Sequence, residues 1–378
     1  NVIAGNLVGT GPDGLTLVGS QNYGVTLGGN SQDNLVGTDG DGQSDLFERN
    51  VIAGAQGNEV TLIGAGVIGN RVSGNFIGLG SDGTTLVLNG DRGVTIESGA
   101  SGNIIGTNSD GFGDSIEGNV IGGMTQMGVR ITESNNNRVS GNLIGTDDSG
   151  LAAAPNALGI KIENGATGNL IGTDGDGIND AGERNVISGN SSAGILLQSD
   201  ANTVAGNLIG VAINGTSPLP NWGHGVDVNS NNNIIGSDGD GNGDARERNT
   251  ISANALSGIA VLQGDGNIVA GNTIGTDASG TLNLGNANHG IEILNSTGTT
   301  IGGSVANTIA FNAFSGIAIT ETATGVSLNN SIRRNSIYKN ALLGIELGGD
   351  GITSNDSGDV DAGPNACLLY TSDAADDN

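Results

Sequence analysis

The sequence predicts an all-β protein, a parallel β-solenoid of about eleven coils with three short strands per coil and open ends. Three observations predict this fold class. Glycine and asparagine, which favour turns, supply 71 and 49 of the 378 residues. The β-branched residues Ile and Val outnumber Leu by 60 to 29, as expected for strands. One short segment recurs at intervals of 26 to 35 residues, which indicates a repeat architecture.

The recurring segment has the form Gly-hydrophobic-x-hydrophobic. It begins at Gly24, Gly93, Gly128, Gly159, Gly194, Gly225, Gly258, Gly290, Gly316 and Gly344, and Glu59-Val-Thr-Leu fills one further place. Two more strand types, Asn-x-Ile-Gly and Asn-Val-Ile-Ser-Gly-Asn, lie between successive copies. Strands this short cannot bury a face alone, so we expect like positions to stack from coil to coil, with Ile and Val pointing inward.

A longer period joins the coils in pairs. Asn-x-Ile-Gly segments begin at Asn34, Asn103, Asn169 and Asn233, which are 69, 66 and 64 residues apart. An acidic loop follows this segment in one coil of each pair, and a longer variable loop follows Gly-Asn-x-Ile-Gly in the other. At the Gly-Asn corners we expect Asn in the left-handed conformation, with its amide bonded to copies in adjacent coils, and Gly to allow the tight turn. These corners are Gly141-Asn142, Gly206-Asn207 and Gly271-Asn272.

Three segments carry a resemblance to known proteins: Asn185-Val-Ile-Ser-Gly-Asn190, Gly141-Asn-Leu-Ile-Gly-Thr-Asp147 and Gly271-Asn-Thr-Ile-Gly-Thr-Asp277. With them the chain resembles the right-handed parallel β-helix repeat proteins of pectin-lyase-like fold, in particular the repeat arrays of large bacterial secreted or surface-attached proteins. The resemblance implies this fold for residues 1–366 and an extracellular or cell-surface location. It implies no single activity, because the fold hosts lyases, hydrolases, epimerases, adhesins and phage spikes.

The domain organisation follows from where the pattern stops. Residues 1–366 are expected to form one β-helix domain, a fragment truncated at both ends, since the N-terminus has no signal peptide. Residues 367–378 are expected to be a disordered, non-native tail. Within it, residues 367–376 resemble the translation of a transposase adapter used in sequencing libraries. The single Cys367 lies in this tail and therefore indicates nothing about redox compartment.

Charge and hydropathy exclude two classes of partner. The net charge is −27, with 12 Lys and Arg against 39 Asp and Glu. Binding to nucleic acid or to an anionic membrane surface draws on clustered cations, so neither partner is expected. No apolar run approaches 18 residues, so we expect no membrane insertion of this chain.

An acidic loop that occurs four times is the most regular charged feature. Oxygen-bearing side chains stand at loop positions 1, 3, 7 and 10, and the loops resemble the calcium loops of thrombospondin type 3 and dockerin repeats. Ca²⁺ takes six to eight oxygen ligands, so we expect structural Ca²⁺ sites. The candidate ligands are Asp39, Asp41, Asp45 and Glu48; Asn108, Asp110, Asp114 and Glu117; Asp174, Asp176, Asp180 and Glu183; and Asp238, Asp240, Asp244 and Glu247.

One departure and one alternative qualify this expectation. Those families usually carry another Asp two residues earlier, where this chain has Gly37, Gly106, Gly172 and Gly236. The alternative is a solvated Asp-Gly turn without metal. In that case the last Glu of the loop pairs with the Arg that follows it, as in Glu48-Arg49, Glu183-Arg184 and Glu247-Arg248.

Features that suggest an enzyme are scattered. Gly223-His224-Gly225 resembles a motif of polygalacturonases, but the paired Asp signatures of that inverting family are missing from neighbouring coils. Arg130 and Lys161 could form a small basic patch suited to lyase chemistry. Trp222, the single Trp, could stack on a sugar ring or cover the apolar floor of its own loop. We assign no catalytic residue, and keep Trp222 and His224 as weak ligand-binding candidates.

These features predict an extracellular or cell-surface structural or adhesive stalk, stabilised by Ca²⁺ and with a polysaccharide or cell-surface glycan as its partner. Repetition runs through every coil and chemistry is concentrated in none, which suits a spacer better than a catalyst. Two alternatives stay open. One is a polysaccharide-active lyase, hydrolase or epimerase, and the other is a fibre subunit that associates end to end through its exposed strand edges.

Overall fold

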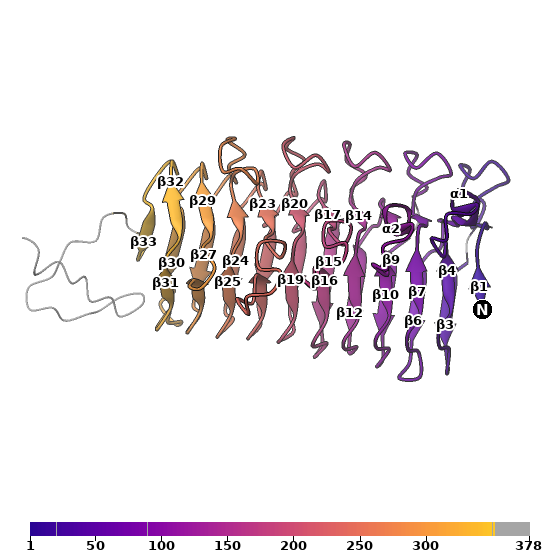
Figure 1. The fold of residues 1–378 in the computed structure, drawn as a ribbon, viewed down its shortest axis with the longest axis horizontal. Helices are drawn as coiled ribbons and strands as arrows, with labels where there is room; N and C mark the ends of the chain where they lie inside the picture. Colours follow the sequence, from indigo (N-terminus) through magenta and orange to yellow (C-terminus); the bar gives the residue numbers. More distant parts are fainter. Residues whose placement is uncertain (20, 89, 350, 352–378) are drawn as a thin grey trace, which may run out of the picture.

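A computed structural model describes residues 1–19, 21–88, 90–349 and 351. These residues form an elongated rod in which the chain winds through three parallel sheets of eleven strands each (Figure 1). The coil count, the three strands per coil and the open sheets confirm the predicted solenoid. The suspected adapter tail, residues 367–378, lies outside the described residues. No helix among the described residues is both long enough and apolar enough to cross a bilayer.

The first sheet begins each coil, and each of its strands precedes an acidic loop or a short corner. Its strands are β1 (Val2–Ile3), β4 (Leu35–Gly37), β7 (Arg71–Ser73), β10 (Ile104–Gly106), β13 (Arg138–Ser140), β16 (Leu170–Gly172), β19 (Thr203–Ala205), β22 (Ile234–Gly236), β25 (Ile268–Ala270), β28 (Thr300–Gly302) and β31 (Ser331–Arg333).

The second sheet has the shortest strands and carries the long loops at its far end. Its strands are β2 (Leu7–Val8), β5 (Val51–Ile52), β8 (Phe76–Ile77), β11 (Val120–Ile121), β14 (Leu143–Ile144), β17 (Val186–Ile187), β20 (Leu208–Ile209), β23 (Thr250–Ile251), β26 (Thr273–Ile274), β29 (Thr308–Ala310) and β32 (Ser336–Tyr338).

The third sheet contains the recurring Gly-hydrophobic-x-hydrophobic segments. Its strands are β3 (Val25–Gly28), β6 (Asn58–Ile63), β9 (Arg92–Glu97), β12 (Met127–Thr132), β15 (Leu158–Glu163), β18 (Ile195–Leu197), β21 (Val226–Val228), β24 (Ile259–Leu262), β27 (Ile291–Leu294), β30 (Ile317–Thr320) and β33 (Ile345–Leu347). Two one-turn helices, α1 (Asp45–Glu48) and α2 (Asp114–Glu117), end the first two acidic loops.

The interior is a set of aliphatic ladders. Every second strand residue points inward and packs on its copy one coil away, as Ile121 pairs with Ile144 and Val129 with Ile160. Most of these side chains are completely buried. Parallel strands lie about 4.8 Å apart, so eleven coils rise roughly 50 Å. Ile and Val fill such a narrow interior without aromatic side chains, which explains the composition.

Asparagine ladders run along the corners. Between the first and second sheets, each Asn donates from its side-chain amide to the amide oxygen of the next, in the order Asn6, Asn50, Asn75, Asn119, Asn142, Asn185, Asn207, Asn249, Asn272, Asn307 and Asn335. A second ladder precedes the first sheet from Asn1 to Asn267, and a third runs from Asn156 to Asn340 after the second sheet.

The predicted corner contacts are therefore confirmed, but the predicted backbone conformation of the Asn residues is wrong. Gly206, with φ 75°, takes the left-handed conformation, and Asn207 is absent from the described non-glycine residues with positive φ. The Gly turns the chain, and this leaves the Asn free to point its amide inward along the ladder.

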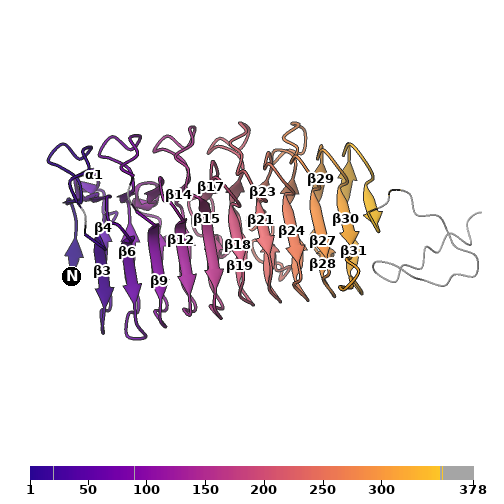
Figure 2. The same ribbon diagram turned by 180° about the vertical axis from the view of Figure 1, so that it is seen from behind.

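The variable loops after the second sheet form antiparallel hairpins on alternate coils. Their bridges join Thr10 to Leu17, Leu79 to Leu86, Thr146 to Ala153, Val211 to Pro218 and Thr276 to Asn283. These hairpins project from one side of the rod, at the top of Figures 1 and 2. They stand beside the outward face of the second sheet and form one wall of the groove described below.

Candidate functional site

The four acidic loops lie at the corner between the first and second sheets, on every second coil. We call residues 39–48, 108–117, 174–183 and 238–247 loops 1 to 4. In three of them, carboxylate oxygens gather within 4.8 Å of one another: Asp39, Asp41 and Asp45 in loop 1, Asp174, Asp180 and Glu183 in loop 3, and Asp238, Asp240 and Asp244 in loop 4. Loop 2 has Asn108 at its first position. The structure thus brings three of the four predicted ligands together in loops 1, 3 and 4, and leaves Glu48, Asp176 and Glu247 outside these groups. Among the described residues, the carboxylates of loop 2 form no such group, and cation binding stays a prediction for all four loops.

A hydroxyl group organises each loop from within. In loop 1, Thr38 Oγ1 donates to Asp45 Oδ1 at 3.2 Å and to Glu48 Oε2 at 2.9 Å, joining positions 7 and 10. In loop 4, Ser237 Oγ donates to Asp244 Oδ1 at 2.6 Å. The seventh and tenth positions therefore converge on one point beneath the loop, where the first sheet ends.

Two arginines from the preceding coil reach the buried Glu of loops 2 and 3. Arg71 Nη1 donates to Glu117 Oε1 at 3.0 Å, and Arg138 forms ion pairs with Glu183 and, at 3.1 Å, with Asp174. Burial raises the pKa of Glu117, and the charge of Arg71 acts against this rise. In these ion pairs the Glu contacts an Arg of the preceding coil. The predicted alternative, in which the Glu pairs with the Arg that directly follows it in the chain, is therefore wrong.

The arginines that directly follow the last Glu of loops 1 and 3, Arg49 and Arg184, point away from the loops. Arg49 Nε donates to the carbonyl oxygen of Gly74 at 3.0 Å, and its guanidinium lies 3.8 Å from Asp148 and 4.1 Å from the ring centre of Phe76. Arg184 Nε likewise donates to a backbone carbonyl, at 2.8 Å. A Glu-Arg dipeptide in the sequence suggests an ion pair between the two side chains. At this corner, however, successive side chains point to opposite sides of the chain, so the pair does not form.

Loop 4 differs because its Glu has no arginine. Thr203 stands in β19 at the position that Arg71 and Arg138 occupy in β7 and β13. Glu247 is 7% exposed, and its Oε2 accepts no hydrogen bond of normal geometry in the described part of the chain. Burial raises the pKa of Glu247, and so do the charges of the nearby Asp238 and Asp244.

The ligand-binding candidates Trp222 and His224 lie on the approach to β21. Trp222 is 70% exposed, so it does not cover the floor of its loop and remains available for stacking. His224 is half-buried, and its Nδ1 has no hydrogen-bond partner among the described residues. Burial raises the pKa of Asp227, the outward residue of β21, while the charge of His224 acts to lower it and that of Glu292 to raise it.

Asp227 and Glu292 stand on one outward column of the third sheet, with Ala260 between them. Because β24 lies between β21 and β27, the backbones of these two outer strands are about 9.6 Å apart. Ala260 is completely buried, so neighbouring side chains cover the position between the two acidic residues. Ser257 Oγ donates to Glu292 Oε2 at 2.7 Å and fixes its orientation. Sequence reasoning missed this pair, because its members are separated by 65 positions and share no local motif.

The expected basic patch is neutralised by its neighbours. Arg130 Nε donates to Glu163 Oε1 at 2.6 Å and lies within ion-pair distance of Glu97. Lys161 Nζ lies 2.6 Å from the other oxygen of Glu163. Both cations are engaged, so this column is a mixed-charge surface rather than a site that offers a free base.

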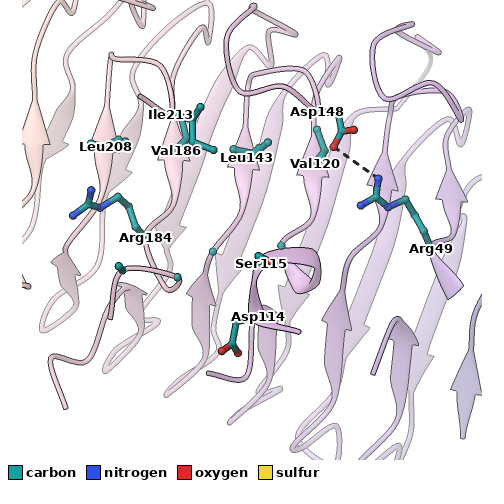
Figure 3. Close-up of a pocket in the computed structure, with 14 residues that line it drawn as sticks. Arg49, Asp114, Ser115, Val120, Leu143, Asp148, Arg184, Val186, Leu208 and Ile213 are labelled. Carbon is teal, nitrogen blue, oxygen red and sulfur yellow. Dashed lines mark ion pairs between the residues drawn. The ribbon is translucent and has the colours of Figure 1, made fainter. Parts of the chain in front are cut away.

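A groove of about 350 Å³ runs over the second sheet (Figure 3). Outward aliphatic side chains of neighbouring strands form its floor. Its walls are the corner segments that end loops 2 and 3 and the hairpins that carry Asp148 and Ile213. Arg49 and Arg184 stand at opposite ends, and no ion pair joins Arg184 to a described carboxylate. The floor consists of Val120, Leu143, Val186 and Leu208.

Comparisons with known proteins identify the fold. No protein-family model and no curated protein sequence matches the chain. It is similar to the A-module of mannuronan C-5 epimerase AlgE4 of Azotobacter vinelandii, at 12% identity and a TM-score of 0.51 over 88% of each chain. It is also similar to the Dettilon tailspike protein, at 15% identity and a TM-score of 0.51 over 83% of this chain and 53% of that one. Identities this low show the fold alone, a right-handed parallel β-helix of pectin-lyase-like type.

Proposed function

We propose that this chain is a rigid extracellular or cell-surface β-helix with a structural or adhesive role, and that it contacts polysaccharide along its side. The Asn ladder from Asn6 to Asn335 is the observation that carries the structural half of this proposal. It runs through all eleven coils and ties each coil to the next by a buried amide. Bending the rod would break bonds that buried amides cannot replace with water.

The groove over the second sheet supports the contact with polysaccharide. It extends over four neighbouring strands of the second sheet, and the half-buried Leu143 of its floor offers an apolar surface to the faces of sugar rings. Arg184 presents guanidinium donors that no described carboxylate engages, and these suit sugar hydroxyl or carboxylate oxygens. The two proteins of similar fold are named for a mannuronan epimerase and a tailspike, which favours a glycan partner and an extracellular setting.

Affinity electrophoresis in gels that contain acidic or neutral polysaccharides tests this function. We expect at least one polysaccharide to retard the chain, and the recovered polymer to keep its length and its sugar composition. Migration unchanged by every polysaccharide would refute the adhesive half of the proposal.

A polysaccharide-active enzyme is the second candidate, and the column of Asp227, Ala260 and Glu292 favours it. Inverting glycosidases hold two carboxyl groups about 6.5–9.5 Å apart, one raised in pKa as the acid and one as the base for a water. The raised pKa of Asp227 fits the acid, and Glu292 fits the base. Asp227→Asn would abolish new reducing ends in such an enzyme, whereas activity at the wild-type level in this variant would remove the candidate.

End-to-end self-association also remains a proposal. The outer strands β1 and β2 expose the apolar side chains of Val2 and Leu7. An open strand edge with such side chains is a template for another chain. Sedimentation velocity over a hundredfold range of concentration tests it, and a constant sedimentation coefficient would refute it.

A further inference from the structure

An arginine that directly follows an acidic loop recurs along the second sheet. Arg49, Arg184 and Arg248 follow the last Glu of loops 1, 3 and 4. Arg49 Nε donates to the carbonyl oxygen of Gly74, and Arg184 Nε donates to that of Gly206. Figure 3 shows the side chains of Arg49 and Arg184 extended in the same direction along the rod. These two arginines are thus equivalent, and they stand four coils apart.

Arg49 has a carboxylate of the chain itself as its partner. Its guanidinium lies 3.8 Å from Asp148, the third residue of the hairpin that follows β14 (Figure 3). The preceding residue, Asp147, accepts hydrogen bonds from the amides of Leu151 and Ala152. One Asp therefore holds the hairpin together, and the next Asp faces the arginine.

The equivalent partner of Arg184 is missing. The hairpin four coils further on follows β26, and its third residue is Ala278. Asp277 keeps the role of Asp147, because it accepts from two backbone amides of its own hairpin. No carboxylate of the described residues forms an ion pair with Arg184. The Arg184 guanidinium therefore lacks the carboxylate that its equivalent has.

A cavity of about 140 Å³ lies at this place. It is lined by the exposed Arg184, by Ala278 and by the apolar Leu208 and Ile213. Because Arg184, Leu208 and Ile213 also line the groove over the second sheet, the cavity continues that groove. A guanidinium can present two parallel N–H donors to one carboxylate, and in the described part of the chain only the Nε of Arg184 is engaged. The cavity thus suits a carboxylate carried by a ligand.

A second arginine stands two coils further along the rod. Arg184 precedes β17 and Arg248 precedes β23, so their backbones are about 9.6 Å apart. Arg248 Nη1 donates to Thr273 Oγ1 at 3.5 Å, and among the described residues Arg248 forms no ion pair. A sugar ring with its glycosidic bond extends a polysaccharide by a length comparable to the height of one coil. Carboxylates on every second sugar therefore match the spacing of the two arginines.

Negative charge beside the groove disfavours a polymer that is charged on every sugar. The chain has a net charge of −27, and Asp114 and Asp148 line the groove. Additional ligand carboxylates between the arginines would be repelled by these groups. A polymer in which neutral sugars separate the charged ones avoids this repulsion.

We propose that Arg184 and Arg248 bind the carboxylates of an acidic polysaccharide in which a charged sugar alternates with a neutral one. The polymer lies parallel to the rod axis, and its carboxylate at Arg184 takes the place that Asp148 fills at Arg49. This inference rests on the proposed contact with polysaccharide and names the chemical class of that partner.

Affinity electrophoresis with three polymers separates this inference from the proposed function. Hyaluronan alternates a uronic acid with a neutral sugar, its carboxyl-reduced form is uncharged, and polygalacturonate is charged on every sugar. We expect hyaluronan to bind about tenfold more tightly than either of the others. Equal binding of hyaluronan and one of the others would overturn the inference and leave the contact with polysaccharide intact. Failure of all three to bind would also overturn it, whereas the proposed function fails only if no other polysaccharide retards the chain.

Ala278→Asp supplies the missing carboxylate from within the chain and leaves Arg184 in place. We expect this variant to bind hyaluronan about tenfold more weakly, because the new carboxylate engages the guanidinium. Asn283→Asp is the matched control, since it adds the same charge to the same hairpin and keeps an oxygen for the amide of Gly285. The control should bind as the wild type. Equal weakening in the two variants would point to net charge and contradict the role of the cavity.

Arg248→Gln tests the second arginine separately. It should weaken binding of the hyaluronan polymer about tenfold and leave binding of a hyaluronan disaccharide unchanged, because one carboxylate cannot reach both arginines. Unchanged binding of the polymer by this variant, with circular dichroism showing intact β structure, would overturn the arrangement of two arginines.

Discussion

Arg71 Nη1 donates to Glu117 Oε1 at 3.0 Å, although the two residues are 46 positions apart and belong to different coils. The Glu117 side chain is completely buried, and the Arg71 guanidinium remains partly accessible. The pair shows that the acidic loops are held by the coil beneath them as well as by their own turns. A carboxylate of one coil is thus neutralised by an arginine of the neighbouring coil. The sequence of the loops alone is therefore insufficient to predict their role.

Removing this arginine should destabilise the protein strongly. Arg71→Gln leaves the buried Glu117 without a charged partner, and breaking such a pair costs about 3 kcal/mol. Urea unfolding followed by circular dichroism measures the change. Arg246→Gln is the control, since its ion pair with Asp180 is long and its side chain exposed, and about 0.5 kcal/mol is expected. Similar losses in the two variants would contradict the role assigned to the Arg71 pair.

The Asn ladder should be equally sensitive. The Asn207 amide donates to Asn249 at 3.0 Å and to the carbonyl of Ile171 at 2.9 Å, and its oxygen accepts from Asn185. Asn207→Ala leaves several buried groups unpaired, at a cost of roughly 3 kcal/mol in the free energy of unfolding. Asn22→Ala, at an exposed position, should change it by less than about 0.5 kcal/mol. If Asn207→Ala left the free energy of unfolding unchanged, the basis for a rigid rod would be removed.

Glu59 should make stability depend on pH. Burial raises the pKa of Glu59 to about 7, against hydrogen bonds from the amides of Gly54 and Ala55. The folded chain thus keeps a proton that the unfolded chain releases near its ordinary value of 4.5. The stability contributed by the protonated form is fully present below pH 4.5 and is lost as pH rises through 7.

Comparison with Glu59→Gln isolates this effect from the other carboxylates. The amide keeps an oxygen for both backbone donors and carries no charge at any pH. We expect the variant to gain on the order of 3 kcal/mol relative to the wild type between pH 4.5 and pH 8, by urea titration at each pH. A difference that stays constant over this range would show that Glu59 ionises normally in the folded chain.

Arg184 should be the groove residue on which polysaccharide binding depends most. Arg184→Gln removes a guanidinium that no described carboxylate engages, and a charge-assisted hydrogen bond contributes about 1.5–3 kcal/mol, or roughly ten- to a hundredfold in affinity. Retardation in a polysaccharide gel measures the effect. Arg333→Gln makes the same change of charge at an exposed position of β31 and should bind as the wild type. Equal weakening in the two variants would point to net charge rather than to the groove.

The fold was predictable because its signals are local and repeated. Each coil contains its own Gly turn, its alternating Ile and Val, and its corner Asn. Register follows once these are stacked. The left-handed conformation assigned to Asn207 was wrong because Gly206, directly before it, adopts that conformation at lower steric cost.

The candidate sites were only partly predictable. The acidic loops are local, so their ligands could be named, but their arginine partners lie one coil away. Asp227 and Glu292 meet on a column that only the register reveals. The groove depends on hairpins and loop ends from several coils, and the apolar residues of its floor resemble ordinary strand residues in the sequence.

Binding without cleavage is the central claim, and a single mixture tests it most directly. The chain is incubated with the polysaccharide that retards it most, and the polymer is then analysed for chain length, unsaturated ends and sugar composition. We predict retention that weakens in Arg184→Gln, with a polymer identical to the untreated sample. New reducing or unsaturated ends, or epimerised residues, that disappear with Asp227→Asn would contradict it and assign the chain to the enzymes.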